Sequence, residues 1–363
     1  MSSFFGQHVK LALFGQSHGE AIGVTIDGLP AGMTIDMEAL RAEMARRAPG
    51  SSAMTTARRE ADEPEILSGV MDGRTTGQPI CAVIRNTNTR SRDYGDGVDL
   101  RRPGHADYTG HVRYFGFEDW RGGGHFSGRL TAPIVFAGAL CHQYLRGQGV
   151  EIAAHIQQLG ALCDQGFLEA EAVDMARLRA MALPTLTPGL SARMEAEILR
   201  AKAEKDSVGG VIECMVTGLP AGLGAPFFDS VESVLAHLLF SVPAVKGVAF
   251  GEGFGFARLR GSEANDAFRL DAAGRVTTAT NRCGGVLGGI TDGMPMVFRC
   301  CVRATPSIAR RQATVSVRRG TEEDVEISGR HDPCILPRAV PVIEAMAAIG
   351  IMELWKERAA CVR

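Results

Sequence analysis

The sequence predicts an α+β protein whose sheets are mainly antiparallel. Strand-like runs follow one another without an intervening helix at 65–86 and 294–318, so neighbouring strands can pair through short connections. A βαβ array would need a helix between successive strands, and these two stretches lack one. No internal repeat, low-complexity stretch or clear linker divides the chain, and we therefore expect a single domain over residues 1–363.

Five segments carry helical patterns and end signals, namely 37–47, 131–146, 194–206, 230–240 and about 337–356. Asp36 and Asp229 are the expected N-caps of the first and fourth helices, with Glu232 completing a capping box in the latter. Pro133 falls in the first turn of the second helix, where proline is tolerated. Pro341 should interrupt or kink the last helix.

Strand signals fall between these helices, at 9–14, 20–27, 65–70, 79–86, 150–158, 208–217, 245–251, 294–303 and 312–318. Most of these runs are rich in valine and isoleucine and are bounded by glycine or proline. Cys300 and Cys301 are neighbours in one run, so their side chains should face opposite sides of a sheet.

Composition sets limits on the class of protein. The 363 residues are 45% hydrophobic and 22% charged, which allows a substantial core. A formal net charge of −2 gives no overall attraction to nucleic acid or to a membrane, so a bound anion would need local arginines. We expect no secretory signal and no transmembrane helix. Nine cysteines without a C-x-x-C motif indicate a reduced, cytoplasmic protein and no metal site.

Glycine is unusually frequent, with 44 residues, and several of these glycines cluster beside histidine and arginine. Residues 15–19 (GQSHG) fit G-x-S-x-G, the nucleophile elbow of serine hydrolases, with Ser17 as nucleophile. That elbow needs a helix after it, whereas residues 20–27 alternate like a strand. His18 is either a titrating group on an open loop or a surface turn residue.

Three further loops carry candidate chemistry: 101–107 (RRPGHAD), 121–129 (RGGGHFSGR) and 329–334 (GRHDPC). Arginines suit phosphate and carboxylate groups, and a glycine-rich loop that leads into a helix can bind an anion. The second loop lacks G-K-[ST], which argues against a nucleotide hydrolase. The first could be only a solvated charged loop, and Asp332 only a helix cap. Together they suit acid–base chemistry on a small, doubly anionic substrate.

The chain resembles the chorismate synthase family in a series of segments that occur in the family's order, namely FGQSHGEAIGVTIDGLPAG, RRPGHADYT, RGGG, VKGVAFGEGF, RGSEAND, GGVLGGI and GRHDPC…PRAVPVIEAM. The resemblance implies a β-α-β sandwich in which antiparallel sheets enclose a helical layer, assembled as a homotetramer. It also implies an anti-1,4 elimination of phosphate from 5-enolpyruvylshikimate-3-phosphate, which yields chorismate in aromatic amino acid biosynthesis. Reduced FMN is the implied cofactor, and a flavin carries the difficult chemistry while the protein orients it.

The same resemblance implies roles for individual residues. His18 would be the acid at the departing phosphate, His105 would balance charge on the reduced flavin, and Asp332 would act in removing the C6 proton. Substrate contacts would come from Ser17, Arg47, Arg102, Ser127, Arg129 and Arg330. Flavin contacts would come from His125, Phe126, Ser127, Pro243, Ala244, Gly288, Arg303, Ala304, Thr305, Pro306, Ser307 and Arg330.

This chain departs from the family's usual residues at several places. Gln16 replaces a glutamate, Ala48 an arginine, His125-Phe126 an Arg-Ser pair and Arg303-Ala304 a Lys-Pro pair. Ala53 replaces an arginine that the family commonly pairs with Arg47 as an NADP contact. These changes keep most of the charge but alter the expected flavin and phosphate walls. No reductase domain is expected beside the family segments, so reduced flavin should come from an external source such as a flavin reductase.

Two other functions remain open from the residues alone. One is a homologue that binds flavin or phosphate without catalysis, and the other is a serine hydrolase that uses Ser17.

Overall fold

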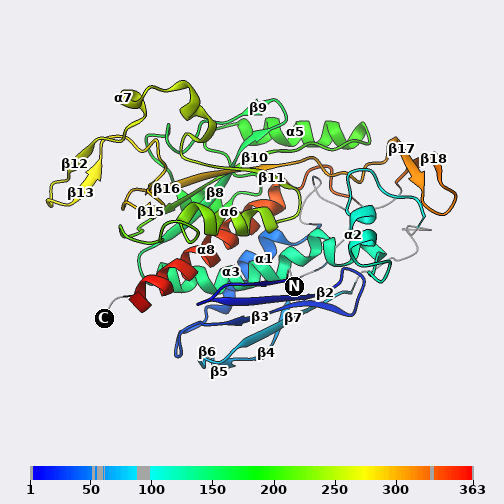
Figure 1. Ribbon diagram of the computed structural model, residues 1–363, viewed down its shortest axis with the longest axis horizontal. Coiled ribbons are helices and arrows are strands. Elements are labelled where there is room, and N and C mark those ends of the chain that lie inside the picture. The colour runs from blue at the N-terminus through cyan, green and yellow to red at the C-terminus, as the bar shows by residue number, and fades with distance from the viewer. Residues whose placement is uncertain are drawn as a thin grey trace.

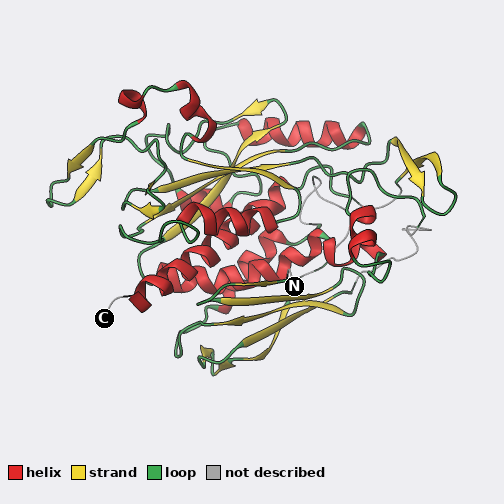
Figure 2. Ribbon diagram, in the orientation of Figure 1, coloured by secondary structure: helices red, strands yellow, loops and turns green. Residues whose placement is uncertain are grey.

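The computed structural model describes residues 3–50, 54, 60, 62–87, 99–327 and 331–361. Two five-stranded sheets enclose a layer of helices, so the predicted sandwich of antiparallel sheets around a helical layer is confirmed (Figures 1 and 2). In both sheets, all pairs of neighbouring strands that the structure describes are antiparallel.

The first sheet lies below the helices in Figure 1. Its strands, in spatial order, are β1 (Phe4–Phe5), β2 (Lys10–Gly15), β3 (Ala21–Asp27), β7 (Ile80–Arg85) and β4 (Pro64–Ser68). Ile22, Val24 and Ile26 of β3 are almost completely buried. They recur at every second position, because alternate side chains of a strand point to the same face. This row is the face that packs against helix α3 (Thr131–Arg146).

The second sheet lies above the helices. Its strands, in spatial order, are β11 (Val245–Phe250), β16 (Met296–Val302), β10 (Gly210–Thr217), β8 (Glu151–Leu159) and β9 (Leu162–Cys163). Cys300 is buried against the helical layer and Cys301 is exposed, which confirms the predicted alternation.

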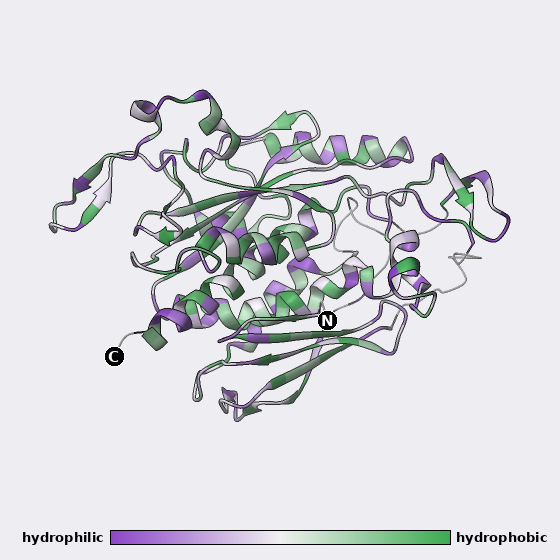
Figure 3. Cartoon of the chain, in the orientation of Figure 1, coloured by the Kyte–Doolittle hydropathy of each residue, from purple (hydrophilic) through white to green (hydrophobic). Residues whose placement is uncertain are grey.

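The middle layer contains four helices that contribute buried residues to the main hydrophobic core (Figure 3). They are α1 (Met37–Arg47), α3, α6 (Val231–Ser241) and α8 (Leu336–Cys361). Small residues allow α8 to approach its neighbours closely: a Cβ atom at Gly138 of α3 would lie 2.3 Å from the Cβ of Ala345. Among the described residues, no helix combines the length and apolar character needed to cross a membrane.

Shorter elements surround the sandwich. The peripheral helices are α2 (Asp107–Arg113), α4 (Met175–Ala180), α5 (Leu190–Ala203) and α7 (Gly261–Ala264). Within the described residues, the 3₁₀ segments are η2 (Arg121–Phe126), η3 (Gly128–Leu130) and η4 (Gly253–Arg258). Four hairpins are formed by β5 (Val70–Met71) with β6 (Arg74–Thr75), β12 (Phe268–Leu270) with β13 (Val276–Thr278), β14 (Val286–Leu287) with β15 (Ile290–Thr291), and β17 (Arg311–Ser316) with β18 (Thr321–Glu326).

The structure corrects three details of the predicted helices. Helix α5 begins at Leu190 rather than at 194. Ser230, not Asp229, caps α6, because its hydroxyl accepts a hydrogen bond from the amide of Ser233 at 3.1 Å. Helix α8 continues through Pro341 without interruption. Pro341 is the sixth residue of α8, so it removes one intrahelical hydrogen bond, the one to the Pro337 carbonyl, while the helix continues on both sides of it.

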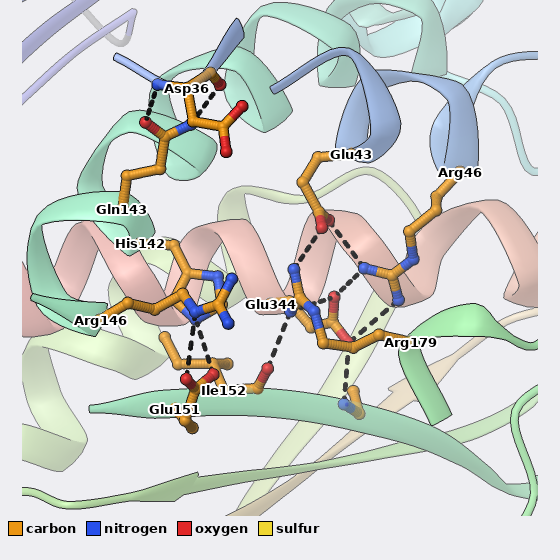
Figure 4. A network of polar contacts seen from close by, with 11 residues as sticks. Asp36, Glu43, Arg46, His142, Gln143, Arg146, Glu151, Ile152, Arg179 and Glu344 are labelled. Carbon is orange, nitrogen blue, oxygen red and sulfur yellow. Dashed lines mark hydrogen bonds and ion pairs between the residues drawn. The ribbon is translucent and has the colours of Figure 1, made fainter. Parts of the chain in front are cut away.

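A buried carboxylate ties the helical layer to the second sheet. Glu344 of α8 pairs with Arg46 of α1 and with Arg179 of α4, and it accepts a hydrogen bond of 2.9 Å from the amide of Ala154 in β8 (Figure 4). Burial alone would raise the pKa of Glu344, but the two guanidinium groups and the amide hold the pKa below its usual value. The group therefore remains an anion that joins four elements.

Candidate functional site

A cavity of about 740 Å³ opens where the starts of α3 and α8 meet the end of α6. Loops from distant parts of the chain complete it, including the segments around 102–106, 122–128 and 303–307. Its lining includes the apolar side chains of Leu238, Val242, Ile335, Val342 and Met346. It also includes the arginines Arg47, Arg102, Arg129, Arg303 and Arg338. A cavity of this size and mixed lining suits a small anionic ligand beside a flat apolar one.

A buried aspartate holds two of these arginines together. Arg47 Nη1 lies 2.5 Å from Asp62 Oδ2, and Arg129 contacts the other oxygen of the same carboxylate. Arg47 also donates to Thr131 Oγ1 at 3.1 Å and to the carbonyl of Gly128 at 3.0 Å. These contacts fix the arginine at the start of α3. Asp62 is completely buried and pairs with both cations, and Arg129 also pairs with the buried carboxylate of Glu60.

Burial and like charges act on the pKa values of this cluster. Burial lowers the pKa of Arg47 to about 10, and the nearby positive charges of Arg338 and Arg129 add to the shift while Asp62 opposes it. For Asp62, the two guanidinium groups outweigh burial and lower the pKa of the carboxyl. The cluster therefore contains two buried carboxylates, Asp62 between the two cations and Glu60 at 3.2 Å from Arg129 Nε.

A second cluster forms at the start of α2. Arg102 donates to the Asp107 carboxylate from Nε at 2.8 Å and from Nη2 at 2.7 Å. His105 Nδ1 lies 2.7 Å from Asp107 Oδ1. The tight turn 102–105, closed by a hydrogen bond from the His105 amide to the Arg102 carbonyl, brings all three side chains together. Arg102 and His105 both line the cavity.

The glycine-rich segment η2 lies against both predicted histidines. Gly122, Gly123 and Gly124 all have positive φ values, which residues other than glycine rarely adopt. A Cβ atom at Gly122 would come within 2.4 Å of the His18 ring, and one at Gly123 would lie 3.3 Å from the His105 ring. Ser17 donates its amide to the Gly124 carbonyl at 3.1 Å. The glycines therefore permit this backbone to pass between the two imidazoles.

Asp332 and His331 enter the cavity just before α8. Arg338 Nη1 lies 2.5 Å from Asp332 Oδ2. Burial lowers the pKa of His331 to about 4, with a further contribution from the positive charge of Arg102. His331 Nε2 has no hydrogen-bond partner among the described residues. This imidazole is neutral near pH 7.

The loop residues 125–127 have different environments. His125 donates from Nδ1 to the Gly15 carbonyl at 2.9 Å, and its Nε2 then accepts from the Ser3 hydroxyl at 2.9 Å. Phe126 packs against Tyr114 with a ring separation of 6.1 Å. Ser127 Oγ accepts from the Arg129 amide at 3.3 Å and caps η3. His125 is thus held by the first sheet and the chain start.

The structure brings most of the predicted site residues to this one cavity. The predicted catalytic and substrate residues that line it are Ser17, Arg47, Arg102, His105, Ser127, Arg129 and Asp332. The predicted flavin residues that line it are His125, Phe126, Ser127, Pro243, Ala244, Arg303, Thr305, Pro306 and Ser307.

Three predicted residues do not line it. His18 lies behind Gly122, which does line the cavity, and Ala304 is the one residue of 303–307 that does not. Gly288 joins β14 to β15 beside the start of α6, where the amide of Val231 donates to the Gly289 carbonyl. The cavity contacts the opposite end of α6 at Ser241. Arg330 and Ala53 lie outside the described residues.

Sequence reasoning did not select Asp62, Arg338 or Asp107 as functional residues. Asp62 and Arg338 lie in segments without a glycine-rich or histidine-containing motif, so no local signal marks them. Asp107 ends the motif 101–107, and the two-residue spacing to His105 was the signal that could have suggested the pair.

The geometry also bears on the serine hydrolase hypothesis and on the question of a metal site. Residues 15–19 connect β2 to β3 in an antiparallel hairpin, whereas a nucleophile elbow connects a strand to a helix. Ser17 is 1% exposed. The serine hydrolase arrangement therefore lacks its structural context. Across the described ranges, no group of three or more histidine, cysteine, aspartate or glutamate side chains could hold a metal ion.

Comparison with known proteins gives a consistent match. The family model described as chorismate synthase matches residues 9–355. A protein named chorismate synthase from Dehalococcoides mccartyi is 45% identical over 354 residues, which cover 98% of this chain and 96% of that protein. One of the same name from Thermococcus gammatolerans is 45% identical over 350 residues, 96% of each chain. A crystal structure titled as chorismate synthase matches with a TM-score of 0.76 and 26% identity, covering 98% of this chain and 93% of that one.

Proposed function

Because the chain belongs to the chorismate synthase family, we propose that it converts 5-enolpyruvylshikimate-3-phosphate to chorismate in an anti-1,4 elimination with reduced FMN. The enzyme is a carbon–oxygen lyase. The observation that carries the proposal is that five arginines, His105 and Asp332 line the same cavity as a set of apolar side chains. Such a cavity can bind an anionic substrate and a flat ring together.

The arginines would bind the substrate's phosphate and carboxylates. Arg47 and Arg129 enter from one side of the cavity with Asp62 between them, and Arg102 enters from another. Guanidinium groups bind phosphate oxygens through paired hydrogen bonds, and fixed cations stabilise the charge that develops on a departing phosphate. Ser17 and Ser127 supply polar groups beside this cluster. Arg330 is proposed as a further contact from its sequence motif alone.

Three side chains would handle protons. His18 would donate a proton to the departing phosphate from behind Gly122, whose missing side chain leaves space for the ring. Asp332, oriented by Arg338, would act in removal of the C6 proton. His105 would balance negative charge at the ring of the cofactor. General acid–base groups of this kind must lie within hydrogen-bond reach of the atoms they serve in the substrate complex.

The lining residues fit a reduced flavin. The apolar residues at the end of α6 and in the first part of α8 suit the face of an isoalloxazine ring. Residues 125–127, 243–244, 303 and 305–307 line the same cavity. When bound, reduced FMN supplies transient electron density to the substrate without net redox change. The residues of this chain would hold the ring against the substrate and exclude water from the reacting face. Gly288 and Ala304 are proposed flavin contacts from the resemblance alone.

We also propose the localisation, the assembly, the domain organisation and the source of reduced flavin from the family resemblance. The protein would act in the cytoplasm as a homotetramer and as one domain over residues 1–363, which a hydrophobic core shared by both sheets and the helical layer supports. It would take its reduced flavin from an external reductase. Its NADP contact would be incomplete at Ala53.

An anaerobic assay with 5-enolpyruvylshikimate-3-phosphate and chemically reduced FMN tests the function. Chorismate formation is expected, and tight flavin binding without turnover would favour a homologue that has lost catalysis. His18→Ala should reduce kcat by about 10²–10⁴-fold, the usual contribution of a general acid, and leave flavin affinity nearly unchanged. Equal loss of both would refute its role at the phosphate.

An assay with NADPH and oxidised FMN, but without a reductase, tests whether the protein can reduce the flavin by itself. No chorismate is expected under these conditions, and turnover would refute dependence on an external reductase.

A further inference from the structure

We propose that Asp107 is a positioning residue that fixes the tautomer of His105, with the proton on Nδ1 and the Nε2 lone pair available to the cavity. The catalytic use of His105 rests on the proposed function, whereas its tautomer follows from local geometry alone. Asp107 lies at the first position of α2, two residues after His105.

The Asp107 carboxylate collects four donors. Arg102 supplies its backbone amide at 3.0 Å, its Nε at 2.8 Å and its Nη2 at 2.7 Å. His105 Nδ1 is the fourth, at 2.7 Å from Oδ1. The Asp107 side chain is 9% exposed and that of Arg102 is 13% exposed, so water competes little for these bonds.

The protonation of His105 follows from the partners of Nδ1. An ionised carboxylate oxygen can only accept a hydrogen bond, so a contact of 2.7 Å requires a proton on Nδ1. Arg102 Nη2 also lies 3.1 Å from Nδ1, but a guanidinium group can only donate. If Nδ1 accepted from Arg102, two acceptors would face each other at the shorter distance. The proton therefore lies between His105 Nδ1 and Asp107.

Neighbouring hydrogen bonds and charges keep the Asp107 carboxyl ionised. Burial alone would raise the pKa of Asp107, but hydrogen bonds from His105 and Arg102 and the charge of Arg102 hold the pKa well below its ordinary value. Asp107 is thus an anion throughout the neutral range. It does not take the proton from His105, and it stabilises the imidazolium that forms when Nε2 is protonated.

The side of the ring that carries Nε2 is kept open. A Cβ atom at Gly123 would lie 3.4 Å from His105 Nε2, so the glycine leaves this nitrogen without a side chain against it. Gly123 directly follows Gly122, which lines the cavity. In the proposed reaction, His105 would accept or donate a proton only through Nε2, while Nδ1 stays committed to Asp107.

Nitrogen-15 NMR of the imidazole rings tests the tautomer directly. In the folded wild-type protein at neutral pH, the long-range proton–nitrogen pattern of His105 should be that of the Nδ1–H form, with the signal assigned by its loss in His105→Gln. Asp107→Asn should shift His105 toward the Nε2–H form, because an amide can donate to Nδ1 as well as accept from it. Asp107→Glu, which keeps a carboxylate, should restore part of the Nδ1–H signal.

Turnover gives the second readout. Asp107→Asn should reduce kcat by about 10²–10⁴-fold with a smaller change in KM, since in the Nε2–H tautomer Nε2 has no lone pair to take up the proton by which His105 would balance charge at the cofactor ring. Glu118→Gln is the matched control, because Glu118 makes the same type of contact, at 3.1 Å, with His111, which does not line the cavity. That variant should keep wild-type turnover.

The outcomes separate this inference from the proposed function. A wild-type protein with the Nε2–H form, or a folded Asp107→Asn variant whose His105 stays Nδ1–H, would overturn the inference whatever the turnover. If the wild type makes no chorismate but its His105 tautomer shifts in Asp107→Asn, the proposed function fails and the positioning role stands.

Discussion

Arg338 Nη1 lies 2.5 Å from Asp332 Oδ2, and Arg338 Nε donates to the Arg47 carbonyl at 3.0 Å. One guanidinium group in the first turn of α8 thus links the proposed proton-removing carboxylate to the helix end that carries the phosphate-binding Arg47. Both side chains of the pair line the cavity and are mostly buried, at 17% and 9% exposed. The pair therefore orients Asp332 in a setting where the solvent cannot replace the contact.

Replacing Arg338 should impair turnover. Arg338→Gln removes the charged partner of Asp332, so the carboxylate loses its orientation, and we expect kcat to fall by about 10–100-fold with folding retained. Arg275→Gln is the control, because Arg275 forms an ion pair with Asp271 of 2.7 Å but is 80% exposed. The anaerobic assay measures both variants. Wild-type kcat in Arg338→Gln would rule out an orienting role.

Asp62 should be essential to the arginine cluster. Asp62→Asn removes the buried carboxylate that pairs with Arg47 and leaves Arg129 with Glu60, which should lower the free energy of unfolding by about 3–5 kcal/mol and reduce kcat/KM. Because the folded pKa of Asp62 is lowered, its contribution is present above its unfolded value and is lost as pH falls through the folded pKa.

Urea unfolding and steady-state kinetics measure these two effects. Glu63→Gln, which breaks an exposed ion pair with Arg41, serves as the neighbouring control and should change stability by less than about 1 kcal/mol. Equal stability of the two variants would contradict a buried structural role for Asp62.

His331 should make stability depend on pH. Its pKa is lowered from 6.5 to about 4, so between these values the unfolded chain binds more protons than the folded protein. The stabilisation is complete above about pH 6.5 and is lost as pH falls toward 4, amounting to at most about 3 kcal/mol for this shift. His331→Asn should reduce the difference in unfolding free energy between pH 7.5 and pH 4.5, measured in urea. An unchanged difference would show that His331 titrates alike in both states.

Glu344 should be a stability residue rather than a catalytic one. Glu344→Gln leaves Arg46 and Arg179 paired with Glu43 alone, and we expect a loss of about 1–3 kcal/mol in unfolding free energy. Glu151→Gln removes an ion pair with Arg146 that is 42% and 55% exposed, and it should cost less than about 1 kcal/mol (Figure 4). Thermal or urea unfolding compares the two. A similar loss in both would mean that burial of Glu344 adds nothing to its contribution.

Periodicity and end signals placed the main strands and the four helices of the middle layer close to their observed bounds. These signals are local, because a buried face repeats every second residue in a strand and every three to four in a helix. The cap of α6 was misplaced by one residue, since Asp229 and Ser230 both have side chains suited to capping and only the backbone geometry selects Ser230. The sequence predicted β17 but not its hairpin partner β18, because β18 consists mainly of charged residues.

The sequence by itself determined the fold class, the family and the loops that carry histidine, arginine and glycine. Only the tertiary structure decided which side chains meet: Asp62 between Arg47 and Arg129, Arg338 against Asp332, and Gly122 against the His18 ring. Arg338 and Asp332 are six residues apart, whereas the other contacts join residues more widely separated in the chain. They depend on how two sheets and four helices pack, which no local pattern of residues encodes.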